Sequence, residues 1–268
     1  MQFKFIVHAV TAAAILSSAA IVFAQSDGQS RPKPEVEANS DSPVAEQPAV
    51  GKLILARSNA LRAGEKLAEL RGSDELMKAA QEFAAFMART GKYGHTADDR
   101  QPRERAAAQG YEACIVAENI GQQFSTRPLS SEQLAREFVE GWANSKEHRA
   151  NLLDPDVSEI GTAVSKSEKT GHFYAVQLFG RPKSESIRIE IENGTSAAVK
   201  YELGNESYDL EGRFARIHEL CRPTEITFLL PKADGTERSV VQPVKAKSRL
   251  VIKRDESQEL VVVRRADR

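Results

Sequence analysis

The sequence has no excess of charge of either sign. Its 37 Lys and Arg residues are matched by 38 Asp and Glu residues, so the formal net charge of the 268-residue chain is −1. Proteins that bind nucleic acid or an anionic membrane by general electrostatic attraction carry a surplus of positive charge. The balance gives no reason to expect either kind of partner, and we expect no nucleic acid to bind.

Several short catalytic motifs are also missing. The chain contains no HExxH, no CxxC and no GxSxG, so it lacks the usual spacing of a helix-borne zinc protease, a paired-cysteine site or a serine-hydrolase elbow. Thr96 and Ser145 are hydroxyls that a hydrolase could use, but nothing in the sequence ties either to a base. The motifs therefore indicate no enzyme class.

The N-terminal residues form an apolar run, MQFKFIVHAVTAAAILSSAAIVFA, with one early lysine and small residues at its end. This pattern is typical of a secretory signal peptide over residues 1–24, cut after Ala24. An uncleaved anchor is the alternative, but His8, Thr11 and two serines weaken the run as a membrane span. No cysteine follows the predicted cut directly, which argues against a lipid anchor. We expect a secreted, periplasmic or extracellular protein without a transmembrane span after cleavage.

Residues 25–50 are rich in Pro, Ser, Glu and Gln and have little to bury, which predicts a disordered tether. The chain has two cysteines, Cys114 and Cys221. In an exported protein they can form a disulfide, which would join two distant regions. Two separate buried thiols fit the spacing equally well.

Residues 51–182 have mainly helical periodicity. Apolar residues recur at three-and-four spacing after Lys52, again over 76–87, and again from Ser130 to Trp142. Ser73 or Asp74 can cap the second helix and Gly91 can end it. The segments EIGTAVS and HFYAVQLFG then read as two strands joined by a polar turn. Helices followed by a hairpin predict an α+β sandwich.

Residues 186–268 have a different pattern. Short segments such as SIRIEIENG and SRLVIKRD alternate apolar and polar residues between Gly, Pro, Asn and Asp turns. This predicts a small all-β, sandwich-like module. We expect a domain boundary near residues 181–186.

Five sequence blocks resemble one known family. They are GHT at 94–96, AENIG at 117–121, WANSKEHRANLL at 142–153, EIGTAV at 159–164 and YAVQLFG at 174–180. In this order they resemble the bacterial branch of the CAP superfamily, also called the SCP domain, which includes cysteine-rich secretory proteins, antigen 5 and pathogenesis-related 1 proteins. The resemblance covers about half the chain. Asn59 and Arg62 also match an N-x-x-R in the family's first helix. The resemblance to this family implies an α-β-α sandwich over residues 51–182.

The family has a cleft with two histidines and two acids that can bind a divalent metal. The resemblance places His95 as the first histidine, Glu118 as the first acid with Asn119 beside it in the cleft, and His148 as the second histidine. The family's usual second acid falls on Ser145, so Glu159 or Glu140 would have to supply it. The expected metal ligands are His95, His148 and Glu118, with Zn²⁺ or another divalent cation as the cofactor. His148 as a packing and capping residue is the alternative.

The resemblance implies a secreted, non-enzymatic binding module joined to a β-rich module. Its cleft would take a small amphipathic or lipid-like molecule, a metal, or a cell-envelope component. The alternatives are a metal-dependent envelope hydrolase or protease, and a structural adhesin with an inert cleft.

Overall fold

The computed structural model describes residues 45–232 and 234–265. The expected signal peptide and residues 25–44 of the expected tether lie outside the described residues. The last residues of that tether do not fit the expectation, because helix α1 begins at Gln47. Pro48 stands in its first turn, where proline is tolerated, and Val50 is fully buried. Val50 belongs to the hydrophobic core, so the first turn of α1 is packed against the rest of the domain.

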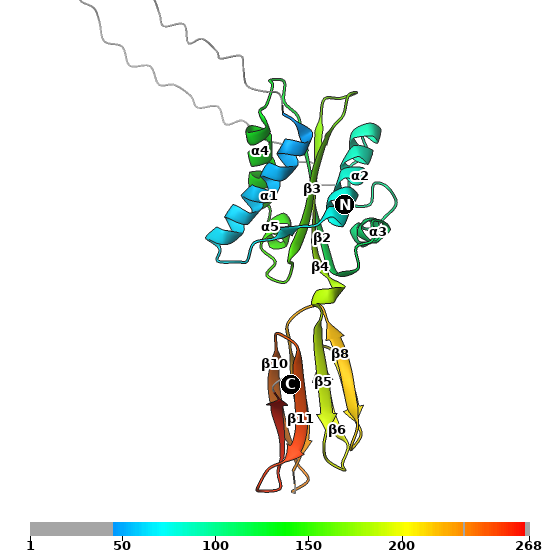
Figure 1. Cartoon of the computed structure of the whole chain (residues 1–268), viewed down its shortest axis with the longest axis vertical. Helices are drawn as coiled ribbons and strands as arrows, with labels where there is room; N and C mark the ends of the chain where they lie inside the picture. Colours follow the sequence, from blue (N-terminus) through cyan, green and yellow to red (C-terminus); the bar gives the residue numbers. More distant parts are fainter. Residues whose placement is uncertain (1–44, 233, 266–268) are drawn as a thin grey trace, which may run out of the picture. The chain divides into compact units, whose positions relative to one another are not determined.

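The first part of the structure has three layers around a four-stranded sheet (Figure 1). The strand order is β1-β3-β4-β2; β3 and β4 form an antiparallel hairpin, β2 is antiparallel to β4, and the short β1 is parallel to β3. Helices α1, α4 and α5 cover one face, and α2 and α3 cover the other. The elements are α1 (Gln47–Gly64), β1 (Arg71–Gly72), α2 (Asp74–Thr90), α3 (Pro102–Ala108), β2 (Ala113–Gln123), α4 (Ser131–Ala143), α5 (Lys146–Leu152), β3 (Glu159–Lys166) and β4 (Phe173–Pro182).

Helix α2 begins and ends at the residues that the sequence predicts. The Ser73 hydroxyl accepts a hydrogen bond from the backbone N–H of Leu76, and Gly91 ends α2 with a left-handed φ of 72°. Ser130 and Gln133 form a reciprocal capping box at the start of α4. Gly161 on β3 lies directly under α2, because a Cβ there would overlap the backbone of Leu76 and Met77. This close approach fixes α2, and with it the loop that follows.

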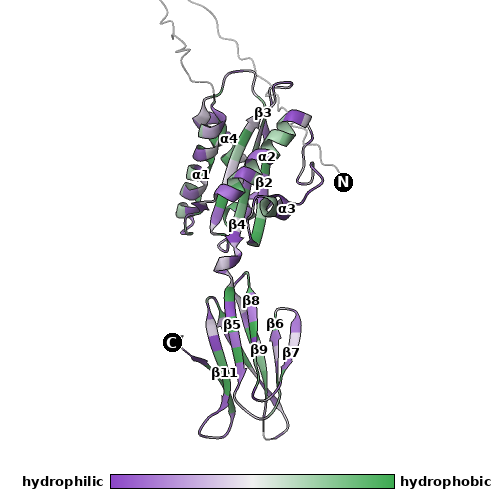
Figure 2. Ribbon diagram, turned by 45° about the vertical axis from the view of Figure 1, so that its right-hand side comes forward, coloured by the Kyte–Doolittle hydropathy of each residue, from purple (hydrophilic) through white to green (hydrophobic). Residues whose placement is uncertain are grey.

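The second part is all β. A 3₁₀ turn at Lys183–Glu185 precedes two four-stranded sheets with strand orders β10-β9-β6-β7 and β12-β11-β5-β8. Their inner faces share one core that includes Ile191, Tyr201, Phe228 and Ile252, so they form a sandwich. The strands are striped apolar and polar in Figure 2, as alternating burial requires. The elements are β5 (Ile187–Asn193), β6 (Val199–Leu203), β7 (Glu206–Leu210), β8 (Ala215–Leu220), β9 (Thr224–Pro231), β10 (Glu237–Val244), β11 (Ser248–Arg254) and β12 (Leu260–Arg265).

The expected α+β class, with an α-β-α sandwich followed by an all-β module, is therefore confirmed. Strand β4 ends at Pro182 and β5 begins at Ile187; a domain boundary between them remains a prediction. Among the described residues, no helix is long and apolar enough to cross a membrane.

The two cysteines form a disulfide. Cys114 on β2 is bonded to Cys221, which follows β8, across a sequence separation of 107 residues. Of the two alternatives that the spacing left open, the bridge is the one found. It ties the helical part of the chain covalently to the β-module.

We expect loss of this bridge to lower the free energy of unfolding by about 2–4 kcal/mol, because the cross-link restricts the unfolded chain over a long loop. Denaturation in urea with and without a thiol reductant measures the effect. The double variant Cys114→Ser/Cys221→Ser should match the reduced protein and should not respond to reductant. Equal stability of oxidised and reduced protein would show that the bridge does not stabilise the fold.

Candidate functional site

The loop after α2 presents His95. Gly91 and Gly94 both have positive φ, 72° and 144°, which releases the chain from the helix and turns it back toward the sheet. A turn then forms in which the N–H of Ala97 donates to the carbonyl of Gly94 at 3.1 Å. The His95 side chain is 49% exposed. It is therefore both anchored by its backbone and accessible to solvent.

Glu118 lies on β2, directly behind His95. One carboxylate oxygen, Oε1, is 2.8 Å from His95 Nδ1, and the other, Oε2, accepts a hydrogen bond from Arg105 at 2.7 Å. The Glu118 side chain is only 1% exposed. Because the carboxylate accepts hydrogen bonds, His95 carries a proton on Nδ1, and in the neutral ring Nε2 is then the nitrogen with the lone pair. The pair thus fixes the tautomer of an exposed imidazole.

Arg105 was not expected from the sequence. It comes from the seven-residue helix α3, its side chain is 4% exposed, and its guanidinium lies 3.6 Å from the centre of the Phe83 ring. It donates to Glu118, to Asp98 Oδ1 at 2.7 Å and to the His95 carbonyl at 2.9 Å. Arg105 therefore neutralises the buried carboxylate and also holds the loop that carries His95. It is a positioning residue.

Tyr93 borders the same carboxylate. Burial raises the pKa of Tyr93, and the nearby Glu118 and Tyr174 raise it further. Its ring lies 6.4 Å from that of Tyr174. The phenol is therefore neutral at physiological pH and lies near Glu118 and Tyr174.

His148 comes from α5, and its approach to His95 is set by Asn119. The Asn119 side chain is fully buried and donates to the carbonyl of His148 at 3.1 Å. Asn151, also on α5, donates to Asn119 Oδ1 at 3.0 Å and to the Glu118 carbonyl at 3.2 Å. These bonds tie α5 to β2, the edge strand of the sheet. Asn119 thus holds the backbone of His148 from a fully buried position, and its expected place in the cleft stays a prediction.

The pKa of His148 is lowered by its surroundings, and His95 contributes to this. Burial lowers the pKa of His148, His95 lowers it further, and Glu147 acts in the opposite direction. A depressed histidine pKa favours the neutral ring. His148 therefore presents a neutral imidazole close enough to His95 to interact with it electrostatically.

The comparisons with known proteins address this region of the chain. A model of the cysteine-rich secretory protein family, CAP, matches residues 55–179. This part of the chain belongs to the CAP family. The matched segment contains His95, Glu118 and His148. It also contains most of the α-β-α sandwich, from within α1 to within β4. The resemblance seen in the five sequence blocks is confirmed.

Solved structures of similar fold come from several bacteria. An outer surface protein from Borrelia burgdorferi is 23% identical, with a TM-score of 0.43, over 50% of this chain and 92% of that one. An extracellular protein containing an SCP domain from Bacillus anthracis is 21% identical, with a TM-score of 0.43, over 50% and 41% of the two chains. A cysteine-rich secretory protein from Staphylococcus aureus is 21% identical, with a TM-score of 0.40, over 52% and 40%. This chain thus spans about two fifths of the latter two proteins. No curated protein matches it in sequence.

The two expected second acids lie apart from the histidines of the CAP domain. Glu159 accepts a hydrogen bond from the Tyr111 hydroxyl at 2.8 Å and pairs with Arg71 at 3.1 Å. Glu140 is 65% exposed on α4 and lies 4.0 Å from Arg136. Neither makes a contact with His95, Glu118 or His148 among the described residues. A second acid at this site, from Glu159 or Glu140, therefore stays a prediction.

The donor set of the CAP domain fits a metal only in part. His95 Nε2 and the His148 ring are available as nitrogen donors. Both Glu118 oxygens are already engaged, so Glu118 fits the role of a residue that orients His95 better than that of a direct ligand. Within residues 45–232 and 234–265, no group of three or more His, Cys, Asp or Glu residues is arranged to hold a metal ion. The expected three-ligand set stays a prediction.

The remaining described histidines belong to other environments. The His172 ring packs against that of Phe124 in a tilted arrangement, with ring centres 4.9 Å apart. In the β-module His218 Nε2 lies 2.6 Å from the Tyr201 hydroxyl, and burial lowers the pKa of His218. These two rings serve as comparison points for tests of His95 and His148.

Proposed function

We propose that this chain is an exported binding protein whose CAP domain binds a divalent metal ion through His95 and His148, and with it a small ligand. The observation that carries the proposal is the Glu118–His95 hydrogen bond of 2.8 Å, anchored from behind by Arg105. Carboxylates that hold the far nitrogen of an imidazole are typical of metal-binding histidines. The lowered pKa of His148 supplies a second neutral nitrogen.

Zn²⁺ accepts imidazole ligands and is most often four-coordinate, so two histidines leave positions open. A metal bound there would act as a Lewis acid toward an oxygen of a ligand. The protein's own contribution is to orient His95 through Glu118 and to hold the backbone of His148 through Asn119. A small amphipathic molecule or a cell-envelope component with a polar head fits such a surface.

A nucleophilic hydrolase is a weaker proposal. In the part of the chain that the structure describes, no Ser, Thr or Cys side chain forms a hydrogen bond with the ring of His95 or His148. Ser145 stands at the N-cap of α5 and makes no side-chain capping bond. A binding role requires no such group, so we favour it over an envelope hydrolase or an inert adhesin.

Export is part of the proposal. The disulfide between Cys114 and Cys221 is a feature of proteins that leave the reducing cytoplasm. The similar structures are described as an outer surface protein, an extracellular protein and a secretory protein. Together with the signal-like residues 1–24, these observations support a location outside the cytoplasm.

Zinc titration tests the metal site. By calorimetry at pH 7.5 we expect micromolar or tighter binding to the wild type and a loss of about 100-fold or more in His95→Ala and in His148→Ala, because each removes one of two nitrogen donors. Binding should weaken as the pH falls through the pKa of His148, which lies below the ordinary histidine value of about 6.5, since protons compete for the same nitrogen. His172→Ala is the matched control and should bind as the wild type does.

The outcomes separate the alternatives. No zinc uptake at pH 7.5, or equal losses in all three histidine variants, refutes the metal site, and amphipathic ligands should then be tested alone. Turnover of ester or peptide substrates by the zinc-loaded protein, absent in His95→Ala, would show a hydrolase and not a binding module.

A further inference from the structure

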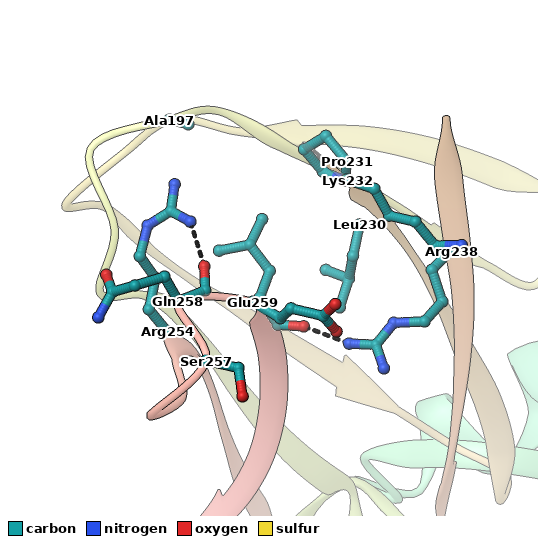
Figure 3. Close-up of a pocket in the computed structure, with 10 residues that line it drawn as sticks. Ala197, Leu230, Pro231, Lys232, Arg238, Arg254, Ser257, Gln258 and Glu259 are labelled. Atoms are coloured by element: carbon teal, nitrogen blue, oxygen red, sulfur yellow. Dashed lines mark hydrogen bonds between the residues drawn. The ribbon is translucent and has the colours of Figure 1, made fainter. Parts of the chain in front are cut away.

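A concave site lies in the β-module, separate from the histidines of the CAP domain. It has a volume of about 430 Å³, which is within the range of small-molecule pockets. Four segments line it: Ala197 before β6, residues 230–232 at and just after the end of β9, Arg238 on β10, and Arg254 with residues 257–260 of the hairpin between β11 and β12 (Figure 3). Both sheets of the sandwich therefore contribute to it.

Two guanidinium groups flank this pocket from opposite sides (Figure 3). Arg254 donates one hydrogen bond from Nη1 to the carbonyl of Gln258 at 2.5 Å, and Arg238 donates one from Nη2 to the carbonyl of Leu260. A guanidinium has five N–H donors. Each arginine is thus held in place by a main-chain oxygen and keeps most of its donors free, since neither has another partner among the described residues.

The pocket has more positive than negative charge. Lys232, Arg238 and Arg254 line it against the single carboxylate of Glu259. Two other arginines of the module are paired with acids: Arg188 lies 3.7 Å from Glu219, and Arg249 lies 2.7 Å from Glu192. Arg238 and Arg254 have no carboxylate within ion-pair distance in the described chain. Lys232 is partly balanced through space by Asp234. An uncompensated pair of guanidinium groups in a pocket favours an oxyanion.

The hairpin between β11 and β12 is built as a fixed loop. The Asp255 carboxylate accepts hydrogen bonds from the N–H groups of Ser257 at 2.9 Å and Glu259 at 3.0 Å. Gln258 has a left-handed φ of 61°, an uncommon conformation for a residue with a side chain. The carbonyl of this residue accepts the bond from Arg254. The loop therefore orients one of the two guanidinium groups.

The floor of the pocket is apolar. Leu230 and Leu260 are among the buried residues of the module core, and Pro231 and Ala197 extend the apolar lining. A bare inorganic anion would use the arginines and leave this lining unused. A ligand with a charged head and an apolar body would use both.

We propose that this pocket binds an oxyanion carried on a short apolar chain, an alkyl phosphate or an alkyl carboxylate. The two guanidinium groups hold the head, and the leucine floor takes the first part of the chain. The site is independent of the metal site proposed for the CAP domain. It gives the β-module a ligand of its own.

The test is calorimetric titration of the mature protein with octyl phosphate and octanoate below their micellar concentrations. At least one should bind, more tightly than either inorganic phosphate or octanol; the stronger of the two identifies the head group. Arg254→Gln and Arg238→Gln should each weaken binding about tenfold, the size expected for a lost hydrogen bond to a charged group. Lys253→Gln is the matched control: it removes the same charge next to Arg254, outside the pocket lining, and should leave the affinity unchanged.

A variant that binds the alkyl anion more tightly than the wild type provides a further check, because a misfolded protein would bind it more weakly. Glu259→Gln removes the one carboxylate of the lining and should tighten binding several-fold. The proposal is overturned if neither amphiphile binds at millimolar concentration, if octanol binds as tightly as the anions, or if inorganic phosphate binds as tightly as octyl phosphate. It is also overturned if Lys253→Gln weakens binding as much as the two arginine variants.

Discussion

Replacing Glu118 with alanine is expected to lower the free energy of unfolding by about 3–5 kcal/mol, the usual cost of removing one partner of a buried ion pair. The carboxylate is 1% exposed and lies 2.7 Å from Arg105, which is itself 4% exposed. Without the Glu118 carboxylate, Arg105 still donates to Asp98 and to the carbonyls of Arg100 and His95. It loses the more deeply buried of its two acidic partners. Urea denaturation at pH 7 measures the change through the midpoint and slope.

The same substitution should disturb the site that Glu118 supports. His95 would lose the acceptor that fixes its tautomer, so zinc affinity should fall about 10–100-fold even though both nitrogen donors remain. Glu118→Gln keeps the shape and one acceptor, and should cost less stability than the alanine change. Glu140→Ala, on the exposed face of α4, is the control and should change stability by less than about 0.5 kcal/mol. A loss below 1 kcal/mol in Glu118→Ala would mean that the pair contributes little.

Trp142→Ala is expected to cost about 3–5 kcal/mol, as for large aromatic side chains in cores. Trp142 is 3% exposed on the inner face of α4, its ring lies 5.7 Å from that of Phe138, and its indole N–H donates to the carbonyl of Ile120 at 2.9 Å. Thermal unfolding followed by circular dichroism gives the effect. Trp142→Phe should retain most of the packing and lose mainly the hydrogen bond, about 1–3 kcal/mol. An unchanged melting temperature in the alanine variant would contradict this role.

Elements with a regular apolar period could be predicted, and irregular ones could not. Helices α1, α2 and α4 and the β3–β4 hairpin follow the expected three-and-four or alternating spacing. Strand β2 was not predicted as a strand because Glu118 and Asn119 are both buried in the middle of it, one toward each face. Helices α3 and α5 have seven residues each, too few for a periodic signal.

The candidate site shows the same division. His95, Glu118 and His148 were found through a family resemblance, because histidine and acid blocks stand out in a sequence. Arg105 was missed because an arginine in a short helix usually lies in solvent; only packing of α3 against Phe83 and β2 makes it a buried counter-charge. Of the alanines at 106–108 beside it only Ala106 is buried, so that run gave little sign of a packed face. The role of Asn119 depends on a contact with α5, 29 residues away, which no local pattern encodes.

Strand β5 lies between β8 and β11, and Ile189 is in register with Ser248 in a parallel pair. During synthesis, β8 becomes available to one side of β5 well before β11 reaches the other. Until residues beyond Ser248 have emerged, one edge of β5 stays unpaired, and an open strand edge can pair with another chain. A premature stop before β11 would therefore leave a nascent molecule whose CAP elements are complete but whose β-module has an open edge, so C-terminal truncation would carry a risk of aggregation.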